Sequence, residues 1–208
     1  MAVISISRQF GAGGWTLGSA VARRLGYKFV SHDIVNKTAQ EANVSVKWVQ
    51  SIEKEAGDWL SRFTSKLVSS SFIERHIGEG KSDFDEKKYV DFLRKLIPAI
   101  AARDNVVILG RGSQYILQDD PNTIKILMVA ELEDRITFIE KIWEVKRSEA
   151  EKFVLMRQKR INAFLKNFEP RGISDPSLYH ITLNTSKLDL KHAENMIVNM
   201  VKQLGQPS

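Results

Sequence analysis

Three glycines near the start of the sequence carry its clearest chemical pattern. Gly11, Gly13 and Gly14 follow a short apolar run at residues 3–6 and precede apolar residues at helical spacing that continue to Gly26. A strand, a glycine-rich turn and a helix in this order place backbone N–H groups at a helix N-terminus, where the donors and the helix dipole favour phosphate. Glycine suits such a turn because a Cβ would hold the backbone away from the phosphate oxygens. The sequence therefore predicts a phosphate-binding turn made of Gly11, Ala12, Gly13, Gly14, Trp15 and Thr16.

Two kinds of phosphate-binding turn are considered for this stretch. A dinucleotide-binding turn has its first glycine almost at the strand end, whereas Arg8, Gln9 and Phe10 intervene here. Asp33 nevertheless stands where a dinucleotide fold places its ribose-binding acid, so that alternative stays open. The longer loop is more typical of the P-loop of phosphotransferases, which carries Lys and then Ser or Thr after its last glycine. Gly14 takes the place of that lysine, and we expect Arg8 in the same loop to supply the missing positive charge.

The composition is that of a globular domain. The 208 residues form one domain or one core with insertions, and their content of 43% apolar and 27% charged residues is ordinary for soluble proteins. The chain has no cysteine, which excludes disulfides and thiolate-bound metals. No apolar run approaches the roughly 20 residues that span a membrane, and the N-terminus lacks a basic region with an apolar signal core. We therefore expect a cytoplasmic protein with no membrane partner.

The net charge of +6 is concentrated in one segment. Residues 141–171 contain nine Lys or Arg and four Glu, which accounts for most of the excess. Such a local excess favours a site for phosphate or another polyanion over a uniformly basic surface. A nucleic acid would also be attracted, but Tyr and Trp are absent from the segment apart from Trp143, and no recognition motif accompanies it. A nucleic-acid partner is therefore the less favoured interpretation.

Strands and helices alternate along the chain. Apolar runs predict strands at residues 3–6, 27–30, 106–109, 124–129 and 180–184. No convincing strand falls within residues 34–104, whose helical patterns indicate an inserted helical region. This order predicts an α/β fold of three layers around a parallel sheet of about five strands, with right-handed crossovers.

Three helices are expected in the second half of the chain. One covers residues 131–142, and a longer one covers residues 148–166 and begins with a capping box of Ser148 and Glu151. The last helix follows the last strand and is N-capped by Asp189.

Arg111 and Asp33 each follow a predicted strand. Arg111 stands between Gly110 and Gly112, so its guanidinium can bind an anion through two parallel hydrogen bonds with little steric interference. An ordinary surface loop is the alternative. Asp33 either binds an acceptor substrate at the functional edge of the sheet or caps the helix that follows, and both roles stay open.

Arginines that could bind phosphate also lie on two of the predicted helices, residues 131–142 and 148–166. Arg157 and Arg160 are one turn apart and project from the same side of the 148–166 helix. They either belong to the phosphate or polyanion site that the basic segment favours or form part of a solvated helix face. Arg135 lies beside the apolar stripe of the 131–142 helix, where it either faces phosphates or pairs with Glu131.

Several segments resemble those of one enzyme family. They are residues 4–14 (ISISRQFGAGG), 25–33 (which include LGYKF and Asp33), 106–112 (VVILGRG), 129–135 (VAELEDR) and 175–186 (DPSLYHITLNTS). In this order they are similar to the cytidylate kinase-like family, a branch of the P-loop nucleoside monophosphate kinases. The similarity extends across most of the chain and is weakest at residues 45–100.

This resemblance implies a single P-loop NTPase domain over residues 1–208. Within it, residues 34–104 would close over a monophosphate acceptor, and residues 143–175 would form a mobile lid. It further implies ATP and Mg²⁺ as cofactors, nucleotides as partners, and transfer of the γ-phosphoryl group of ATP to CMP or dCMP. The residue types predict no particular oligomeric state.

The same resemblance assigns roles to the candidate residues. The turn at residues 11–16 would hold the donor phosphates, with Mg²⁺ near Thr16. The acceptor would be positioned by Arg111 and Asp33, and the charge on the transferred phosphoryl group would be neutralised by Arg8, Arg160 and, less strongly, Arg157. Two other functions stay open: a non-catalytic nucleotide sensor on the same fold, and a nucleic-acid-binding protein that uses residues 141–171.

Overall fold

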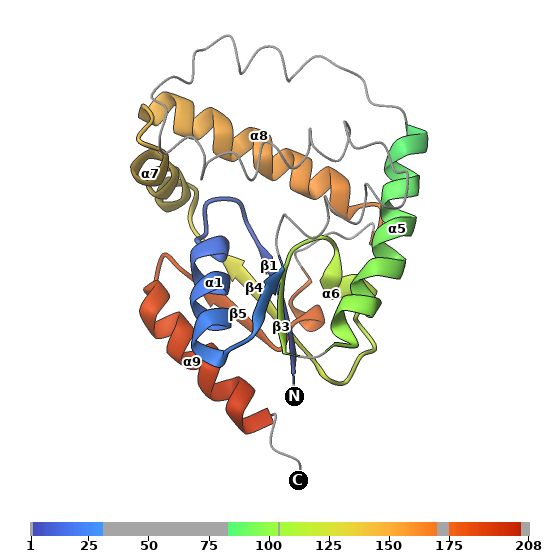
Figure 1. Ribbon diagram of the computed structural model, residues 1–208. Helices are drawn as coiled ribbons and strands as arrows, with labels where there is room; N and C mark the ends of the chain where they lie inside the picture. Colours follow the sequence, from blue (N-terminus) through green and yellow to red (C-terminus); the bar gives the residue numbers. More distant parts are fainter. Residues whose placement is uncertain (1, 31–82, 104, 170–174, 205–208) are drawn as a thin grey trace. The chain divides into compact units, whose positions relative to one another are not determined.

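The computed structural model describes residues 2–30, 83–103, 105–169 and 175–204 (Figure 1). The chain divides into two compact units, one formed by residues 1–31 with 94–208 and the other by residues 32–93. The sheet and all described site residues discussed below belong to the first unit. Asp33 lies outside the described residues, and the described part of the predicted insertion is helix α5 (Asp83–Ala101) with the residues that follow it.

A five-stranded parallel sheet forms the centre of the first unit. Its strands, in the spatial order β2-β3-β1-β4-β5, are β1 (Val3–Arg8), β2 (Lys28–Val30), β3 (Val106–Leu109), β4 (Thr123–Val129) and β5 (Ile181–Asn184). Ile4 of the central strand β1 lies opposite Val107 of β3 and Ile124 of β4. Continuous apolar runs form these strands because a parallel sheet is buried on both faces. The predicted strands and the predicted α/β fold are confirmed.

The helices follow the strands as expected. They are α1 (Gly14–Leu25), α6 (Ser113–Ile116), α7 (Leu132–Trp143), α8 (Arg147–Leu165) and α9 (Leu190–Leu204), with a short 3₁₀ turn η1 (Pro176–Leu178). Asp189 caps α9 as predicted, because its Oδ1 accepts a hydrogen bond from the His192 N–H at 2.9 Å. Within the described part of the chain, no helix combines the length and apolar character needed to cross a membrane.

The capping box predicted for α8 is wrong. An N-cap residue has extended backbone angles, and Lys146 has them, with φ −65° and ψ 148°. The carbonyl oxygen of Lys146 accepts hydrogen bonds from the N–H groups of Glu149 and Ala150, both at 2.9 Å. Ser148 therefore lies inside the first turn of α8 and does not precede it.

Helices cover both faces of the sheet (Figure 1). On one face, α1 and α9 pack on the strands through a buried apolar cluster that includes Ile4, Ile6, Leu17, Val21 and Ile197. On the other face, a second cluster joins Tyr115 of α6, Leu127 of β4 and Leu165 of α8. The three predicted layers are therefore present in this unit.

The two faces of β1 differ in polarity. Ile4 and Ile6 are fully buried on the α1 face, whereas Ser5 and Ser7 alternate with them and are buried on the other. The Ser5 hydroxyl forms a hydrogen bond of 2.7 Å with the hydroxyl of Ser113. Arg8 continues the series of Ile4 and Ile6, so its side chain begins on the α1 face at the carboxyl end of the strand.

Replacing Ile197 with Ala should destabilise the fold strongly, because this side chain of α9 is fully buried against the sheet. Deleting buried methyl groups and leaving a cavity costs about 2–5 kcal/mol of unfolding free energy. The neighbouring Met196 is 45% exposed, so Met196→Ala is the matched control and should change stability by less than about 0.5 kcal/mol. Urea unfolding of both variants measures the difference, and equal losses would contradict the assignment of this face to the core.

Candidate active site

The predicted phosphate-binding turn joins β1 to α1. Gly11 and Gly13 have φ angles of 88° and 79°, which favour glycine over residues with a Cβ. Gly13 directly precedes α1, and neither a capping side chain nor an acidic residue occupies the first turn of that helix. The first N–H groups of a helix have no partner within the helix. This end of α1 therefore offers hydrogen-bond donors and a positive dipole to an anion.

Neighbouring elements fix the position of this turn. A Cβ on Gly11 would lie 2.8 Å from Cβ of Arg135 in α7, and a Cβ on Gly13 would lie 2.9 Å from Cδ2 of Leu190 in α9. The hydroxyl of Thr185 donates a hydrogen bond of 3.2 Å to the carbonyl oxygen of Ala12. The glycines thus serve close packing as well as backbone conformation, and the donors of the turn are held in place before any ligand binds.

Arg8 ends β1, and its side chain extends across the carboxyl end of the sheet toward β3. A Cβ on Gly110 would lie 2.1 Å from Nη1 of Arg8, so the guanidinium packs directly against the Gly110 backbone. Burial and the nearby charge of Arg111 lower the pKa of Arg8 to about 10. Within the described part of the chain, no carboxylate forms an ion pair with Arg8. A desolvated cation in this position favours a bound anion.

The loop that carries Arg111 is conformationally strained. Gly110, Arg111 and Gly112 have φ angles of 74°, 62° and 68°, all in the left-handed region. For Arg111 that conformation costs on the order of 1 kcal/mol. A Cβ on Gly112 would lie 2.8 Å from the ring of Phe168, so close packing determines the path of the loop. Strain of this kind is concentrated at functional sites, which supports a binding role for Arg111.

A side chain of α8 contacts the backbone that leads into the turn. Oε1 of Gln158 accepts hydrogen bonds from the Phe10 N–H at 2.9 Å and from Nη1 of Arg135 at 3.3 Å. Nη1 of Arg135 also lies 3.5 Å from the carbonyl oxygen of Phe10, and burial lowers the pKa of Arg135. Of the two alternatives for Arg135, the pairing with Glu131 is not seen, and the Glu131 carboxylate pairs with Lys187 at 2.7 Å instead. Arg135 faces the turn instead.

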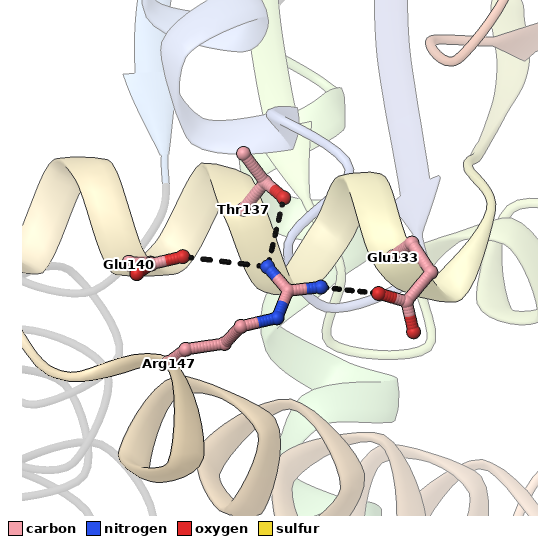
Figure 2. Close-up of polar contacts among 4 residues, drawn as sticks. All are labelled: Glu133, Thr137, Glu140 and Arg147. Atoms are coloured by element: carbon pink, nitrogen blue, oxygen red, sulfur yellow. Dashed lines mark hydrogen bonds and ion pairs between the residues drawn. The ribbon is translucent and has the colours of Figure 1, made fainter.

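Polar contacts join α7 and α8 into a pair. Figure 2 shows Arg147, at the start of α8, reaching three side chains of α7. Its guanidinium lies 3.4 Å from both Thr137 and Glu140 and forms an ion pair with Glu133. These groups are largely exposed, so the contacts orient the two helices more than they stabilise them.

Apolar contacts connect this helix pair to the turn. Ile136, Ile139, Ala150 and Val154 are buried between α7 and α8. Phe10 packs against this cluster, with its ring centroid 5.8 Å from that of Trp143, and Trp143 lies 5.1 Å from Phe153 in turn. The residue just before the turn is therefore held by both the backbone hydrogen bond and the aromatic contacts of the pair.

The predicted lid arginines lie on α8 to either side of Gln158. Arg157 is only 8% exposed, whereas Arg160 is partly exposed. The lysines of the same helix, Lys152, Lys159 and Lys166, are exposed and form a solvated face. The contact between Gln158 and Phe10 brings this part of α8 to the carboxyl end of the sheet (Figure 1). A role for Arg157 and Arg160 at a transferred phosphoryl group stays a prediction.

Buried polar atoms near Arg8 and Arg111 were missed by the sequence analysis. The Ser7 hydroxyl and both polar atoms of the Gln114 amide are buried without a hydrogen-bond partner among the described residues. Burial raises the pKa of the nearby Tyr179 to about 12. A serine in a strand and a glutamine in a short helix give no distinctive sequence signal.

The first turn of α1 suits a magnesium ion bound beside phosphates. Thr16 is exposed there, so its hydroxyl can act as a ligand. Across the described ranges, no three His, Asp or Glu side chains gather as a metal site. In nucleotide sites Mg²⁺ is held mostly by phosphate oxygens and water, with one or two protein ligands, so Thr16 fits that requirement. The role of Thr16 at the metal and that of Asp33 at the acceptor stay predictions.

Several solved structures share this architecture at low sequence identity. An uncharacterized protein from Eubacterium ventriosum ATCC 27560 is 17% identical with a TM-score of 0.68, over 97% of this chain and 99% of that one. A gluconokinase from Sinorhizobium meliloti 1021 is 12% identical with a TM-score of 0.54, over 98% and 93% of the two chains. No curated protein is significantly similar to the chain in sequence.

The five-stranded parallel sheet, the glycine-rich turn after β1 and these relatives define a P-loop kinase fold. More narrowly, the chain belongs to the cytidylate kinase-like family, whose model matches residues 3–187.

Replacing Gln158 with Leu should weaken ATP binding about fivefold, because the Phe10 N–H loses the acceptor that fixes the backbone before the turn. A hydrogen bond of this kind contributes about 1 kcal/mol. Gln158→Glu keeps an acceptor oxygen and should recover much of the affinity, while Lys159→Ala, at an exposed neighbour, is the control. Isothermal titration with ATP measures the three dissociation constants. Wild-type affinity in Gln158→Leu would show that the contact does not position the turn.

Proposed function

We propose that this protein transfers the γ-phosphoryl group of ATP to a pyrimidine nucleoside monophosphate, CMP or dCMP. Membership of the cytidylate kinase-like family supports this substrate class. The observation that carries the proposal is the Arg8 guanidinium, which lies against Gly110 and close enough to Arg111 for their charges to interact. It therefore stands between the turn suited to donor phosphates and the loop suited to the acceptor.

The reaction needs no protein nucleophile. An oxygen of the acceptor monophosphate attacks the γ-phosphorus of ATP, the bond to the β–γ bridging oxygen breaks, and ADP leaves. The acceptor oxygen is largely ionised at neutral pH, since the second pKa of a phosphate monoester is about 6, so no general base is required. Catalysis then depends on holding two polyanions in line and on neutralising the charge between them.

Each element of the site has a role in that task. The N–H groups of residues 11–16 would bind the donor phosphates, and Thr16 would help hold a Mg²⁺ ion, which would neutralise phosphate charge. Arg111 and Asp33 position the acceptor monophosphate. Arg8 supplies the charge that a P-loop lysine supplies elsewhere.

The lid region, residues 143–175, completes the site. Arg160 approaches the transferred phosphoryl group from α8, and the buried Arg157 supports it. Because Gln158 lies between them and contacts Phe10, these arginines are tied to the same backbone that carries the donor-binding turn. The lid thereby adds positive charge at the place where negative charge accumulates.

A panel of ligands separates the proposal from its alternatives. We expect ATP and CMP each to raise the melting temperature, and the two together to give ADP in a coupled assay. UMP, AMP and gluconate serve as competing acceptors, since a structural relative is a gluconokinase. Faster turnover of gluconate would overturn the acceptor class. Stabilisation by nucleotides without any turnover would favour a sensor, and tight, salt-sensitive binding of RNA without nucleotide binding would favour a nucleic-acid-binding protein.

Replacing Arg8 with Met should reduce turnover about a hundredfold while raising stability. Losing one charged contact in a preorganised site costs about 3 kcal/mol of transition-state stabilisation. Removing a desolvated cation that has no described carboxylate partner should raise the unfolding free energy by about 1–3 kcal/mol in phosphate-free buffer. Chemical denaturation and steady-state kinetics on one preparation measure both effects. A lower stability with unchanged kcat would instead make Arg8 a structural residue, and Arg8→Lys should recover part of the turnover.

A further inference from the structure

We propose that the cation and the first glycine of the P-loop have exchanged positions in this chain, an inference that rests on the proposed function. A standard P-loop reads G-x-x-x-x-G-K-[ST], with glycine first and lysine seventh. With Gly13 as the second glycine, the first position is residue 8, the seventh is residue 14 and the eighth is Trp15, so Thr16 stands one residue past the usual Ser or Thr. The chain has Arg8 where glycine is expected and Gly14 where lysine is expected.

The structure shows that side chains at these two positions compete for one space. A Cβ on Gly14 would lie 2.9 Å from Cγ of Arg8 and 3.1 Å from its Cβ. Both atoms belong to the base of the Arg8 side chain, which cannot swing away as the end of a flexible side chain can. The methyl Cδ1 of Leu109 closes the same space from β3, at 3.4 Å. A side chain at residue 14 would therefore occupy the space that the base of the Arg8 side chain occupies. An arginine at residue 8 thus requires glycine at residue 14, and a side chain at residue 14 requires a small residue at residue 8.

A second glycine, Gly110, leaves room for the guanidinium at the end of the Arg8 side chain. A Cβ on Gly110 would lie 2.1 Å from Nη1 of Arg8, so only a glycine leaves room for the guanidinium there. The side chain thus passes over Gly14 and ends at Gly110, next to Arg111. The exchanged cation is delivered to the β3 side of the loop, where it can contact the acceptor phosphate as well as the transferred phosphoryl group.

Arginine is the cation that suits this path. Burial and Arg111 lower the pKa of Arg8 to about 10, so the guanidinium stays protonated at neutral pH. A lysine there would hold its charge less firmly, because its ordinary pKa is lower than that of arginine and the same burial and repulsion would lower it further. Arginine therefore suits residue 8 better than lysine does, which is why Arg8→Lys is expected to recover only part of the activity.

The exchange predicts that restoring the missing lysine at residue 14 destabilises the protein unless Arg8 is removed as well. Four proteins test this: the wild type, Arg8→Gly, Gly14→Lys and the double variant Arg8→Gly/Gly14→Lys. Each is measured for its melting temperature in phosphate-free buffer and for its ATP dissociation constant by isothermal titration. Gly14→Ala, alone and with Arg8→Gly, repeats the stability comparison with a single added methyl group in case Gly14→Lys does not fold.

We expect Gly14→Lys to lower the melting temperature by several degrees and Arg8→Gly to weaken ATP binding by about a hundredfold. The double variant should melt higher than Gly14→Lys and bind ATP at least tenfold more tightly than either single variant. Gly26→Ala is the control, because a Cβ at Gly26 has nothing within 4 Å and its effect should simply add to that of Arg8→Gly.

Two results would overturn the exchange: effects in the double variant that merely add, or a Gly14→Lys protein that is as stable as the wild type and binds ATP equally well. Failure of the proposed function looks different. A wild-type protein that binds no ATP would reject the proposed function, and with it the catalytic meaning of the exchange. The melting temperatures would still show whether residues 8 and 14 share one space.

Discussion

The contact between the Arg8 guanidinium and the backbone of Gly110 is the constraint on which this site depends. It places a permanent positive charge at the carboxyl edge of the sheet, where solvation is poor and Arg111 adds repulsion. While Arg8 holds this position, a Cβ on Gly110 would clash with its guanidinium, and a Cβ on Gly14 would clash with the base of its side chain. A folded protein tolerates such an arrangement when binding an anion offsets its cost, and a strained Arg111 in the next loop is consistent with that trade between stability and function.

The turn at residues 11–16 is positioned by elements that come much later in the chain. Arg135 of α7 packs on Gly11, Leu190 of α9 packs on Gly13, and Gln158 of α8 binds the backbone at Phe10. A displacement of α8 from the turn would break the hydrogen bond to Phe10 and expose aromatic surface there. The helix that is expected to close over the transferred phosphoryl group is therefore coupled mechanically to the donor site, which favours assembly of both in one step.

The shared fold does not fix the acceptor. The gluconokinase relative shares the architecture at 12% identity, so the sheet and the turn are compatible with quite different side chains around them. Phosphoryl transfer needs positioned charges and no protein nucleophile, which lets one scaffold serve several acceptors. In this chain the side chains of Ser7 and Gln114 and the hydroxyl of the partly buried Tyr179 put buried polar atoms near this edge of the sheet, where a core would be apolar.

The sequence by itself determined the five strands, the glycine-rich turn and the class of fold, because apolar runs and glycine spacing are local signals. It also indicated Arg8 and Arg111, since both stand beside strand ends. It failed at the start of α8, where Lys146 and not Ser148 takes the capping conformation. Only the tertiary structure decided which groups meet: Phe10 and Gln158 are 148 residues apart, and the path of Arg8 depends on Gly110 across the sheet. Such contacts follow from the packing of distant segments, and no local pattern encodes them.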